Sequence, residues 1–518
     1  MYQSLGIATR LSSPTWRRLV LVAMAFCACV TPVVLCGQTK APAATPPAPS
    51  PAALGQWAAA VNFCTYPCLV GADAALLNNG KVLFYYYPAS GKNNSQASLL
   101  DPVTGTVTDV SLPMDQDIFC SGLSILPNGK VLVTGGDVEG VDCTKGGGGC
   151  GITTSLLFDP ATSTWTSTQD MFSARWYPSS VELSDGSLLE LSGSDSTGKF
   201  VQKSLETYSY TTAKWTALPT TANLPADVLQ TYPRMSLLPS GKVLMSSPAP
   251  QSYQFDPSTN LWTSVATTNF GFRYFAPHVL LPGQEKVLVA GGSSTHVAGG
   301  SNATNTAEII DMSAATPAWS YTGSMTYARY NENLVLLADG TVLAVGGGGG
   351  GGPYKNPVLT SELYDPKTGQ WTVLAAQTVQ RTYHSTAILL PDGRVVSAGS
   401  DNGFSPQVSY EIFSPPYLFK GQRPLIQSAP TSLTYSAKFK ILTPKASDIT
   451  RVALVRPGAT THADNFDQRY VDLAFTLGPG GLQATAPANG SQAPPGYYML
   501  VLVNSSGVPS VMKFLQLD

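Results

Sequence analysis

Residues 128–136 read Asn-Gly-Lys-Val-Leu-Val-Thr-Gly-Gly, and variants of this stretch recur along the chain. An Asn-Gly pair supplies the positive φ of a tight hairpin turn, and the Val-Leu-Val run that follows is typical of a buried strand. The same pattern occurs in residues 81–87, 187–193, 242–248, 286–292, 341–347 and 394–400. Successive segments start 44 to 57 residues apart, near the kelch-type period of about 50. The chain therefore contains seven repeats.

Each repeat has the strand content of a propeller blade. After the second strand comes a third strand, then an Asp-Pro turn and a strand carrying Trp, as in residues 157–167 (LFDPATSTWTS), 254–264 and 363–373. Four strands form one blade. We predict an all-β protein with a seven-bladed kelch-type β-propeller over residues 57–423. The fifth repeat has Gln284-Glu285 in place of the usual turn pair, which predicts a weaker hairpin there.

The kelch period stops after residue 423. Residues 424–518 contain short alternating runs, including FKILT, RVALVRPG, YVDLAFTL and YYMLVLVN. A region of this length and pattern is typical of an antiparallel immunoglobulin-like β-sandwich. We expect it to pack against the propeller.

The N-terminus has the layout of an export signal. Arg17 and Arg18 precede the apolar run of residues 19–36, so we interpret residues 1–36 as a cleaved signal and the protein as secreted or periplasmic. A retained membrane anchor is the alternative, because the run is just long enough to span a bilayer. Residues 37–56 are rich in Ala and Pro and should form an extended linker.

Composition excludes one class of partner. Only 12% of residues are charged and the formal net charge is -2, which excludes the basic surface of a nucleic-acid binder. We expect a monomer acting on a small molecule.

Five cysteines remain after the predicted signal. Cys64 with Cys68, and Cys143 with Cys150, are close enough in sequence for local disulfides in an oxidising compartment. Cys120 is then unpaired. It is either a small buried side chain or a free thiol with a function.

Candidate site residues stand where first strands begin. In a blade the first strand lies nearest the axis, so Cys120 in blade 2, Trp176-Tyr177 in blade 3 and Tyr383-His384 in blade 7 should share one axial pocket. The chain has only four histidines, and one of them, His462, lies in a loop of the tail. Two imidazoles with phenolate oxygens suit Cu(II). The alternative is a structural role, because Arg273-Tyr274 and Arg329-Tyr330 occupy comparable positions.

Several segments resemble one family. Residues 119–136, 174–193, 381–399, 458–473 and 494–511 are similar, in order and spacing, to segments of the copper-radical oxidases, which include galactose oxidase and glyoxal oxidase. The resemblance covers most of the chain that follows the signal. It includes the tail histidine, which generic kelch similarity would not supply.

The resemblance implies a metal shell and a protein-derived cofactor. One copper ion would be bound by Tyr177, Tyr383, His384 and His462, and Cys120 would be joined through sulfur to the Tyr177 ring. Tyr177 would carry the radical and Tyr383 would accept the substrate proton. The implied activity is oxidation of a small aldehyde or primary alcohol by O2, with release of H2O2.

The residues expected to line the substrate pocket resemble those of the family less closely than the expected copper ligands do. Galactose oxidase has a Trp after the Gly-Gly-Ser of blade 3, whereas Asp195 follows Ser194 here, so galactose is not the expected substrate. Trp176, Asp195, Arg234 and His296 are the candidate substrate contacts. The competing hypothesis is a non-catalytic kelch propeller that binds a carbohydrate or protein partner, with Tyr177 unmodified.

Overall fold

The computed structural model describes residues 50–63, 69–88, 95–112, 117–138, 149–226, 230–296, 303–352, 355–401 and 406–518. The predicted signal, most of the predicted linker, and Cys64, Cys68 and Cys143 lie outside these residues. Helical structure in the described residues is limited to α1 (Pro51–Leu54) and short 3-10 helices at Thr220–Ala222, Pro416–Phe419 and Ala446–Asp448. The all-β prediction is confirmed.

Seven sheets succeed one another along the described part of the chain. Sheet 1 contains β3 (Asp73–Leu76), β4 (Val82–Pro88), β5 (Ser95–Leu100) and β6 (Val107–Asp109). Sheet 2 contains β7 (Gly122–Ile125), β8 (Val131–Thr134), β9 (Ser155–Asp159) and β10 (Thr164–Ser167). Sheet 3 contains β11 (Trp176–Glu182), β12 (Leu188–Ser194), β13 (Leu205–Ser209) and β14 (Lys214–Ala217). Each is a four-stranded antiparallel unit, as the repeats predict.

The remaining sheets keep this order. Sheet 4 contains β15 (Arg234–Leu237), β16 (Val243–Ser247), β17 (Gln251–Asp256) and β18 (Leu261–Thr267). Sheet 5 contains β19 (His278–Leu280), β20 (Lys286–Ala290), β21 (Ala307–Asp311) and β22 (Trp319–Tyr321). Sheet 6 contains β23 (Tyr330–Leu336), β24 (Val342–Gly348), β25 (Thr360–Asp365) and β26 (Gln370–Ala376). Sheet 7 contains β27 (Ser385–Leu389), β28 (Val395–Gly399) and β29 (Ser409–Ser414).

The seventh sheet is completed by strands from the N-terminal end of the described chain. β1 (Gln56–Trp57) and β2 (Val61–Asn62) both pair with β29. The circle is thus closed by N-terminal strands. The first helix or strand among the described residues is α1, and β1 follows it at Gln56, so residues 51–56 of the predicted linker form part of the fold.

The hairpin turns explain the repeated Gly. Gly129 has φ 82°, and its amide donates to the Leu126 carbonyl at 2.8 Å. In the fifth repeat, Gln284 takes the equivalent position with φ 63° and donates to Leu281 at 2.9 Å. The hairpin predicted to be weak there has the same turn hydrogen bond, although Gln284 lacks the conformational freedom of Gly.

Two recurring side-chain contacts support the blades, one between neighbouring blades and one within a blade. The Trp of an outer strand donates its indole N–H to the preceding blade, as when Trp165 bonds the Val110 carbonyl at 2.7 Å. The Arg before a first strand pairs with a third-strand Glu, as Arg329 does with Glu362 at 2.6 Å, both fully buried. The pairs Arg175–Glu206, Arg273–Glu308 and Arg381–Glu411 repeat this arrangement. The Arg-aromatic sequences therefore reflect blade architecture.

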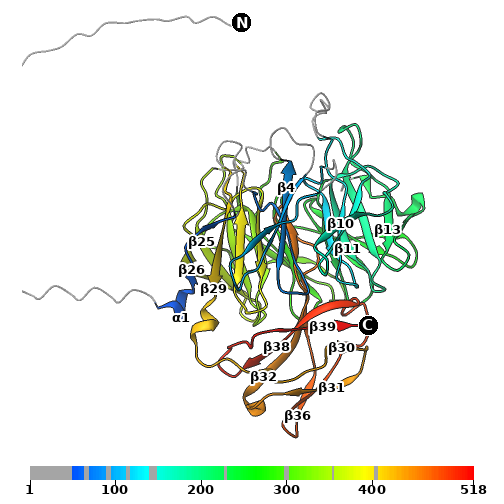
Figure 1. Ribbon diagram of the computed structural model, residues 1–518. Coiled ribbons are helices and arrows are strands. Elements are labelled where there is room, and N and C mark those ends of the chain that lie inside the picture. The colour runs from blue at the N-terminus through cyan, green and yellow to red at the C-terminus, as the bar shows by residue number, and fades with distance from the viewer. Residues whose placement is uncertain are drawn as a thin grey trace, which may run out of the picture. The chain divides into compact units, whose positions relative to one another are not determined.

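The tail forms two further sheets. One contains β30 (Ser432–Leu433), β39 (Lys513–Leu517), β38 (Gly496–Asn504), β32 (Ile449–Val455) and β35 (Tyr470–Asp472). The other contains β31 (Lys438–Leu442), β37 (Gly481–Thr485) and β36 (Phe475–Gly478). Figure 1 shows these strands, in orange and red, grouped at one end of the blades. This is the predicted β-sandwich.

The tail contacts the hairpin ends of the blades through buried arginines. Arg456 donates to the Ile125 carbonyl at 2.9 Å, and Arg469 donates to the Leu237 carbonyl at 2.7 Å. One tail hairpin goes further: β33 (Ala459–Thr461) pairs with β3 of blade 1 and with β34 (Asp464–Asn465). The tail therefore adds two strands to the inner edge of blade 1, at the propeller axis.

Glu190, on β12, makes stability depend on pH. Its carboxyl group is fully buried and accepts hydrogen bonds from Ser180 at 2.7 Å and Thr134 at 3.0 Å, and burial raises its pKa from 4.5 to about 8. Because the folded state holds this proton up to a higher pH than the unfolded chain does, the stabilisation is complete below the unfolded pKa and is lost as pH rises toward 8.

We therefore expect Glu190→Gln to remove a downward slope of about 1.4 kcal/mol per pH unit from the free energy of unfolding between roughly pH 5 and 8. Urea unfolding across this range measures the slope. Glu285→Gln, at an exposed position, is the control for the loss of one carboxyl group. Identical slopes in wild type and Glu190→Gln would contradict the assignment.

Two observations bear on the predicted export: the state of the cysteines and the search for membrane-spanning helices. Cys150 is disulfide-bonded; its expected partner Cys143 lies outside the described residues, so that pairing stays a prediction. Cys120 is a buried free cysteine. No helix within the described ranges has both the length and the hydrophobicity needed to cross a membrane.

Candidate metal centre

Six blades place one residue each in the left-handed region where the first strand begins. These are Cys120 (φ 57°), Tyr177 (64°), Tyr232 (47°), Phe275 (60°), Asn331 (59°) and His384 (60°). Backbone hydrogen bonds link neighbours: Tyr177 N–H donates to the Cys120 carbonyl and Tyr232 N–H to the Tyr177 carbonyl, both at 3.0 Å. Such conformations cost about 1–3 kcal/mol each and cluster at functional sites.

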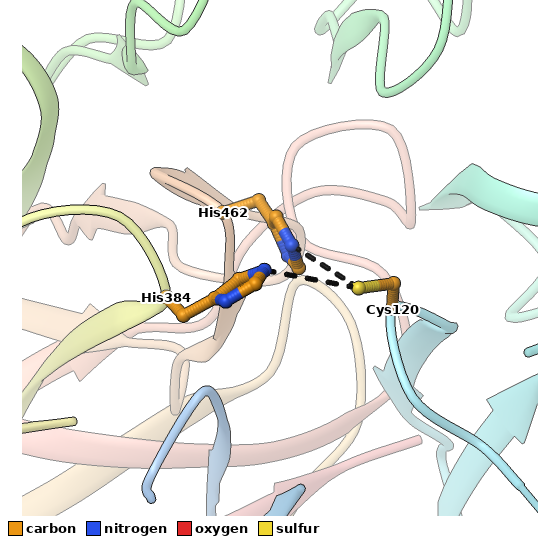
Figure 2. A group of neighbouring side chains, drawn as sticks. All are labelled: Cys120, His384 and His462. Carbon is orange, nitrogen blue, oxygen red and sulfur yellow. Dashed lines mark hydrogen bonds between the residues drawn. The ribbon is translucent and has the colours of Figure 1, made fainter. Parts of the chain in front are cut away.

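Two imidazoles and a thiol meet at this ring. The Cys120 sulfur lies 3.3 Å from Nε2 of His462 and 4.0 Å from Nε2 of His384. All three side chains are buried, and their ligand atoms lie within 4.8 Å of one another. Figure 2 shows the three side chains pointing toward a common point from blade 2, blade 7 and the tail. Both histidines direct Nε2 toward the Cys120 sulfur, so the two imidazoles could bind one cation there.

His462 reaches the axis on the tip of the tail hairpin. Thr461 of β33 faces Asp464 of β34, so His462 and Ala463 form a two-residue turn with φ 48° and 64°. Positive φ at both central residues is the signature of a type I′ turn. The Thr461 hydroxyl is hydrogen-bonded to Nδ1 of His462 at 2.6 Å. This contact occupies Nδ1 and orients Nε2 toward Cys120.

Two phenols complete the cluster. The Tyr177 and Tyr383 hydroxyls are hydrogen-bonded to each other. The Tyr383 ring stacks on His384 with centroids 3.8 Å apart, and its centroid lies 5.3 Å from that of His462. The centroids of Tyr177 and His462 are 4.7 Å apart. The four predicted copper ligands therefore come together.

Burial sets the ionisation of these groups. It lowers the pKa of His384 to about 4 and brings the pKa of His462 well below its ordinary value. Burial, and then the neighbouring Cys120 and Tyr383, raise the pKa of Tyr177 well above 10. Burial also raises the pKa of the Cys120 thiol. The imidazoles are therefore neutral with lone pairs available, and a bound cation would supply the charge that favours phenolate.

A cavity of about 300 Å³ opens beside the phenols. Its wall includes Trp176, Tyr232, Tyr274, Phe275, His296 and Tyr383. Trp176 meets the Tyr177 ring edge-on, with centroids 4.2 Å apart. His296 packs against Tyr274 and Phe275 at centroid distances of 4.9 and 5.8 Å. Both Trp176 and His296 thus line the cavity, as substrate contacts would.

The other two candidate substrate contacts are engaged by the protein. Asp195 is not part of the cavity wall that the described residues form, and its carboxylate accepts from the amide and hydroxyl of Thr197 at 3.0 and 2.7 Å. Arg234 reaches the cavity, but its guanidinium donates to the carbonyls of Ala276, Tyr232 and His462.

Two further residues line the site: the sequence placed Tyr232 only near the pocket-forming region of blade 4, and it gave Phe275 no role. Tyr232 packs its ring 4.8 Å from Tyr177 and 4.9 Å from His462, and its hydroxyl donates to the Ser121 carbonyl at 3.0 Å. Phe275 lies 6.4 Å from Tyr383, centroid to centroid. Both occupy the same repeat position as Cys120, Tyr177 and His384. Alignment of the repeats on their hairpin turns would have found them.

Comparison with known proteins gives a consistent result. The family described as "Glyoxal oxidase N-terminus" matches residues 92–417, and "Galactose oxidase-like, Early set domain" matches residues 423–517. Galactose oxidase of Gibberella zeae is 31% identical over 513 residues, which cover 90% of this chain and 71% of that protein. Aldehyde oxidase GLOX of Vitis pseudoreticulata is 29% identical over 455 residues, covering 77% and 82% respectively.

A solved structure has the same fold. It is described as a novel fungal alcohol oxidase with catalytic diversity among the AA5 family, in complex with copper, and superimposes with a TM-score of 0.77 at 25% identity. The match covers 90% of this chain and 100% of that one. Together with the two family matches, these similarities show that the chain belongs to the copper-radical oxidase family of galactose oxidase and glyoxal oxidase.

Proposed function

We propose that Tyr177, Tyr383, His384 and His462 bind one copper ion, and that this oxidase converts a small aldehyde or primary alcohol with O2. The observation that carries the proposal is the convergence of two neutral imidazole Nε2 atoms and two bonded phenols at one buried point. These groups come from blade 3, blade 7 and the tail. Two nitrogen and two oxygen donors suit Cu(II) better than Zn²⁺, which more often recruits thiolate or carboxylate ligands.

Cys120 supports a protein-derived radical at Tyr177. Its thiol is buried and unpaired, and it is close enough to Tyr177 to contribute to the raised pKa of that phenol. Joining the sulfur to a carbon of the Tyr177 ring removes one hydrogen from each, and O2 accepts the two electrons and two protons to give H2O2. A copper ion bound here would accept one of the two electrons that substrate oxidation releases, so the oxidised, linked Tyr177 ring must accept the other.

The two phenols divide the work on the substrate. Tyr383, as phenolate, accepts the hydroxyl proton of the substrate. The oxidised Tyr177 ring takes the hydrogen atom from the adjacent carbon. For an alcohol the balance is RCH2OH + O2 → RCHO + H2O2. For an aldehyde, the hydrated form reacts in the same way and gives the acid.

The cavity supports a small substrate. Its wall is mostly aromatic, with Trp176 and His296 facing the space beside Tyr177 and Tyr383. Asp195 is bonded within its own loop, so we do not retain it as a substrate contact. We also propose that the protein is exported and acts as a monomer, which the disulfide at Cys150 supports for export.

The cross-link provides the experimental test. Protein expressed without copper is loaded with Cu(II) in air, then reduced and alkylated so that disulfides open while a thioether persists. After reduction and before alkylation, we expect the polypeptide to be two hydrogen atoms lighter than unloaded protein treated in the same way. After alkylation it should also carry one alkyl group fewer, and the peptides containing Cys120 and Tyr177 should be recovered as one species.

Cys120→Ser is the control, because it cannot form the thioether while the four proposed ligands stay in place. It should show no mass change and a loss of peroxide release. Recovery of separate, alkylated Cys120 and unmodified Tyr177 from copper-loaded wild type would refute the proposal. That outcome would instead favour a Cys120–His384–His462 metal site or a binding propeller.

A further inference from the structure

The turn that carries His462 is conformationally strained. A type I′ turn favours Asn-Gly because both central residues need positive φ, but here His462 and Ala463 occupy those positions at 48° and 64°. Non-glycine residues in this region cost about 1–3 kcal/mol each and persist only when their surroundings hold them. Other groups must therefore hold the turn in place.

Arg234, the first residue of β15, contacts this turn from blade 4. Its Nη2 donates to the His462 carbonyl at 3.0 Å, and its Nη1 lies 3.1 Å from Oδ2 of Asp464. Its Nε donates to the Ala276 carbonyl at 2.8 Å, which anchors the guanidinium to blade 5. One side chain therefore contacts the residues on both sides of Ala463, at the backbone carbonyl of His462 and at the side-chain carboxylate of Asp464.

Asp464 is held on its other side by His278, the first residue of β19. Oδ1 of Asp464 lies 3.0 Å from Nδ1 of His278, and Nε2 of His278 donates to the Met235 carbonyl at 2.9 Å. Arg234, His278 and Asp464 are all at least nine-tenths buried. The carboxylate therefore lies between the guanidinium of Arg234 and the imidazole of His278, which come from adjacent blades.

We infer that Arg234, Asp464 and His278 are positioning residues that hold the strained His462–Ala463 turn, so that Nε2 of His462 stays aimed at the metal. The inference rests on the proposed role of His462 as a copper ligand. It also gives Arg234 a different role from the substrate contact expected from the sequence. Because the trio joins blades 4 and 5 to the tail hairpin, it sets where the tail ligand lies relative to the blade ligands.

Asp464→Asn tests the inference directly, since it keeps the shape of the side chain and removes its charge. We expect the Kd for Cu(II) to rise about 10- to 100-fold, the usual range when a residue that orients a ligand is lost. The Cu(II) electron paramagnetic resonance spectrum should change as well, because the angle of one nitrogen ligand is no longer held.

Rescue by Ala463→Gly distinguishes positioning from general stability. Glycine adopts positive φ without strain, so the turn needs less outside support, and the double variant Ala463→Gly/Asp464→Asn should recover most of the copper affinity and the wild-type spectrum. Arg234→Lys is a second test if Asp464→Asn folds poorly. It keeps the charge near Asp464 but lacks the forked guanidinium, and should weaken copper binding in the same direction.

Asp467→Asn is the matched control. Asp467 lies three residues further along the same segment, is buried, and accepts from the Ser124 hydroxyl at 2.7 Å and the Ile125 amide at 2.6 Å. It anchors the tail to blade 2 without touching the turn. We expect this variant to lower the free energy of unfolding while leaving the Kd for Cu(II) within about twofold, far less than the change expected from loss of an orienting residue.

The inference fails if Asp464→Asn binds copper like wild type, if Asp467→Asn weakens binding equally, or if Ala463→Gly gives no rescue. The His462→Ala variant distinguishes failure of this inference from failure of the proposed function. A His462→Ala protein that binds copper normally refutes the ligand assignment itself. Loss of copper in His462→Ala but not in Asp464→Asn refutes only the positioning role.

Discussion

A His462→Ala variant is expected to bind Cu(II) at least about 100-fold more weakly than wild type, because a lost ligand should cost more than a lost orienting partner. Peroxide release should fall by at least about a thousandfold, which corresponds to roughly 4 kcal/mol in the barrier. The neutral Nε2 atom, which faces Cys120 at 3.3 Å, has no substitute in the tail. Copper titration and a coupled peroxide assay measure the two effects.

The fold should survive this substitution. The contacts that seat the hairpin involve backbone atoms, such as the pairing of β33 with β3 and the Arg234 bond to the His462 carbonyl. The thermal transition should therefore stay close to that of wild type. Added imidazole should restore part of the activity by filling the vacated space, and full activity of His462→Ala without imidazole would overturn the metal shell.

Tyr383→Phe is expected to reduce kcat by about 10²- to 10⁴-fold, the usual contribution of a positioned general base. The substitution removes only the hydroxyl that is hydrogen-bonded to Tyr177, while the stacking of the ring on His384 is preserved. Copper should still bind through the remaining proposed ligands. The thioether should still form, because Cys120 and Tyr177 are unchanged.

Tyr330→Phe is the matched control for Tyr383→Phe. Tyr330 is a buried tyrosine of blade 6 whose hydroxyl bonds a backbone carbonyl. It should retain activity within about twofold, well below the loss expected for a general base. Tyr383→Phe with kcat within about tenfold of wild type would show that another group accepts the substrate proton.

The blades were predictable because their determinants are local. Each Gly of a hairpin turn, such as Gly129 with φ 82°, acts on its own turn, and the apolar run after it needs only a neighbouring strand. The predicted second strands appear as β4, β8, β12, β16, β20, β24 and β28. The strands that close the propeller were not predicted. β1 and β2 pair with β29 across more than 300 residues, and nothing in the short sequences of β1 and β2 indicates that partner.

The site residues also divide into those that local sequence patterns indicate and those that depend on contacts between distant segments. Cys120, Tyr177 and His384 could be grouped from the sequence because the repeat gives each the same position at the start of a first strand. Tyr383 and His462 were also singled out from the sequence, and the resemblance to the copper-radical oxidases assigned them as copper ligands. Asp195 was expected to face substrate, yet its carboxylate bonds the adjacent Thr197 instead.

By itself, the sequence determined the number of blades and which residues stand at the axis, because repeat spacing and turn chemistry act over a few residues. Tertiary structure alone decided that Arg234 faces the carbonyl of His462, 228 positions away, and that Asp464 lies between Arg234 and His278. Such contacts depend on how the tail hairpin is inserted at the axis, and packing between distant segments leaves no periodic pattern in the chain.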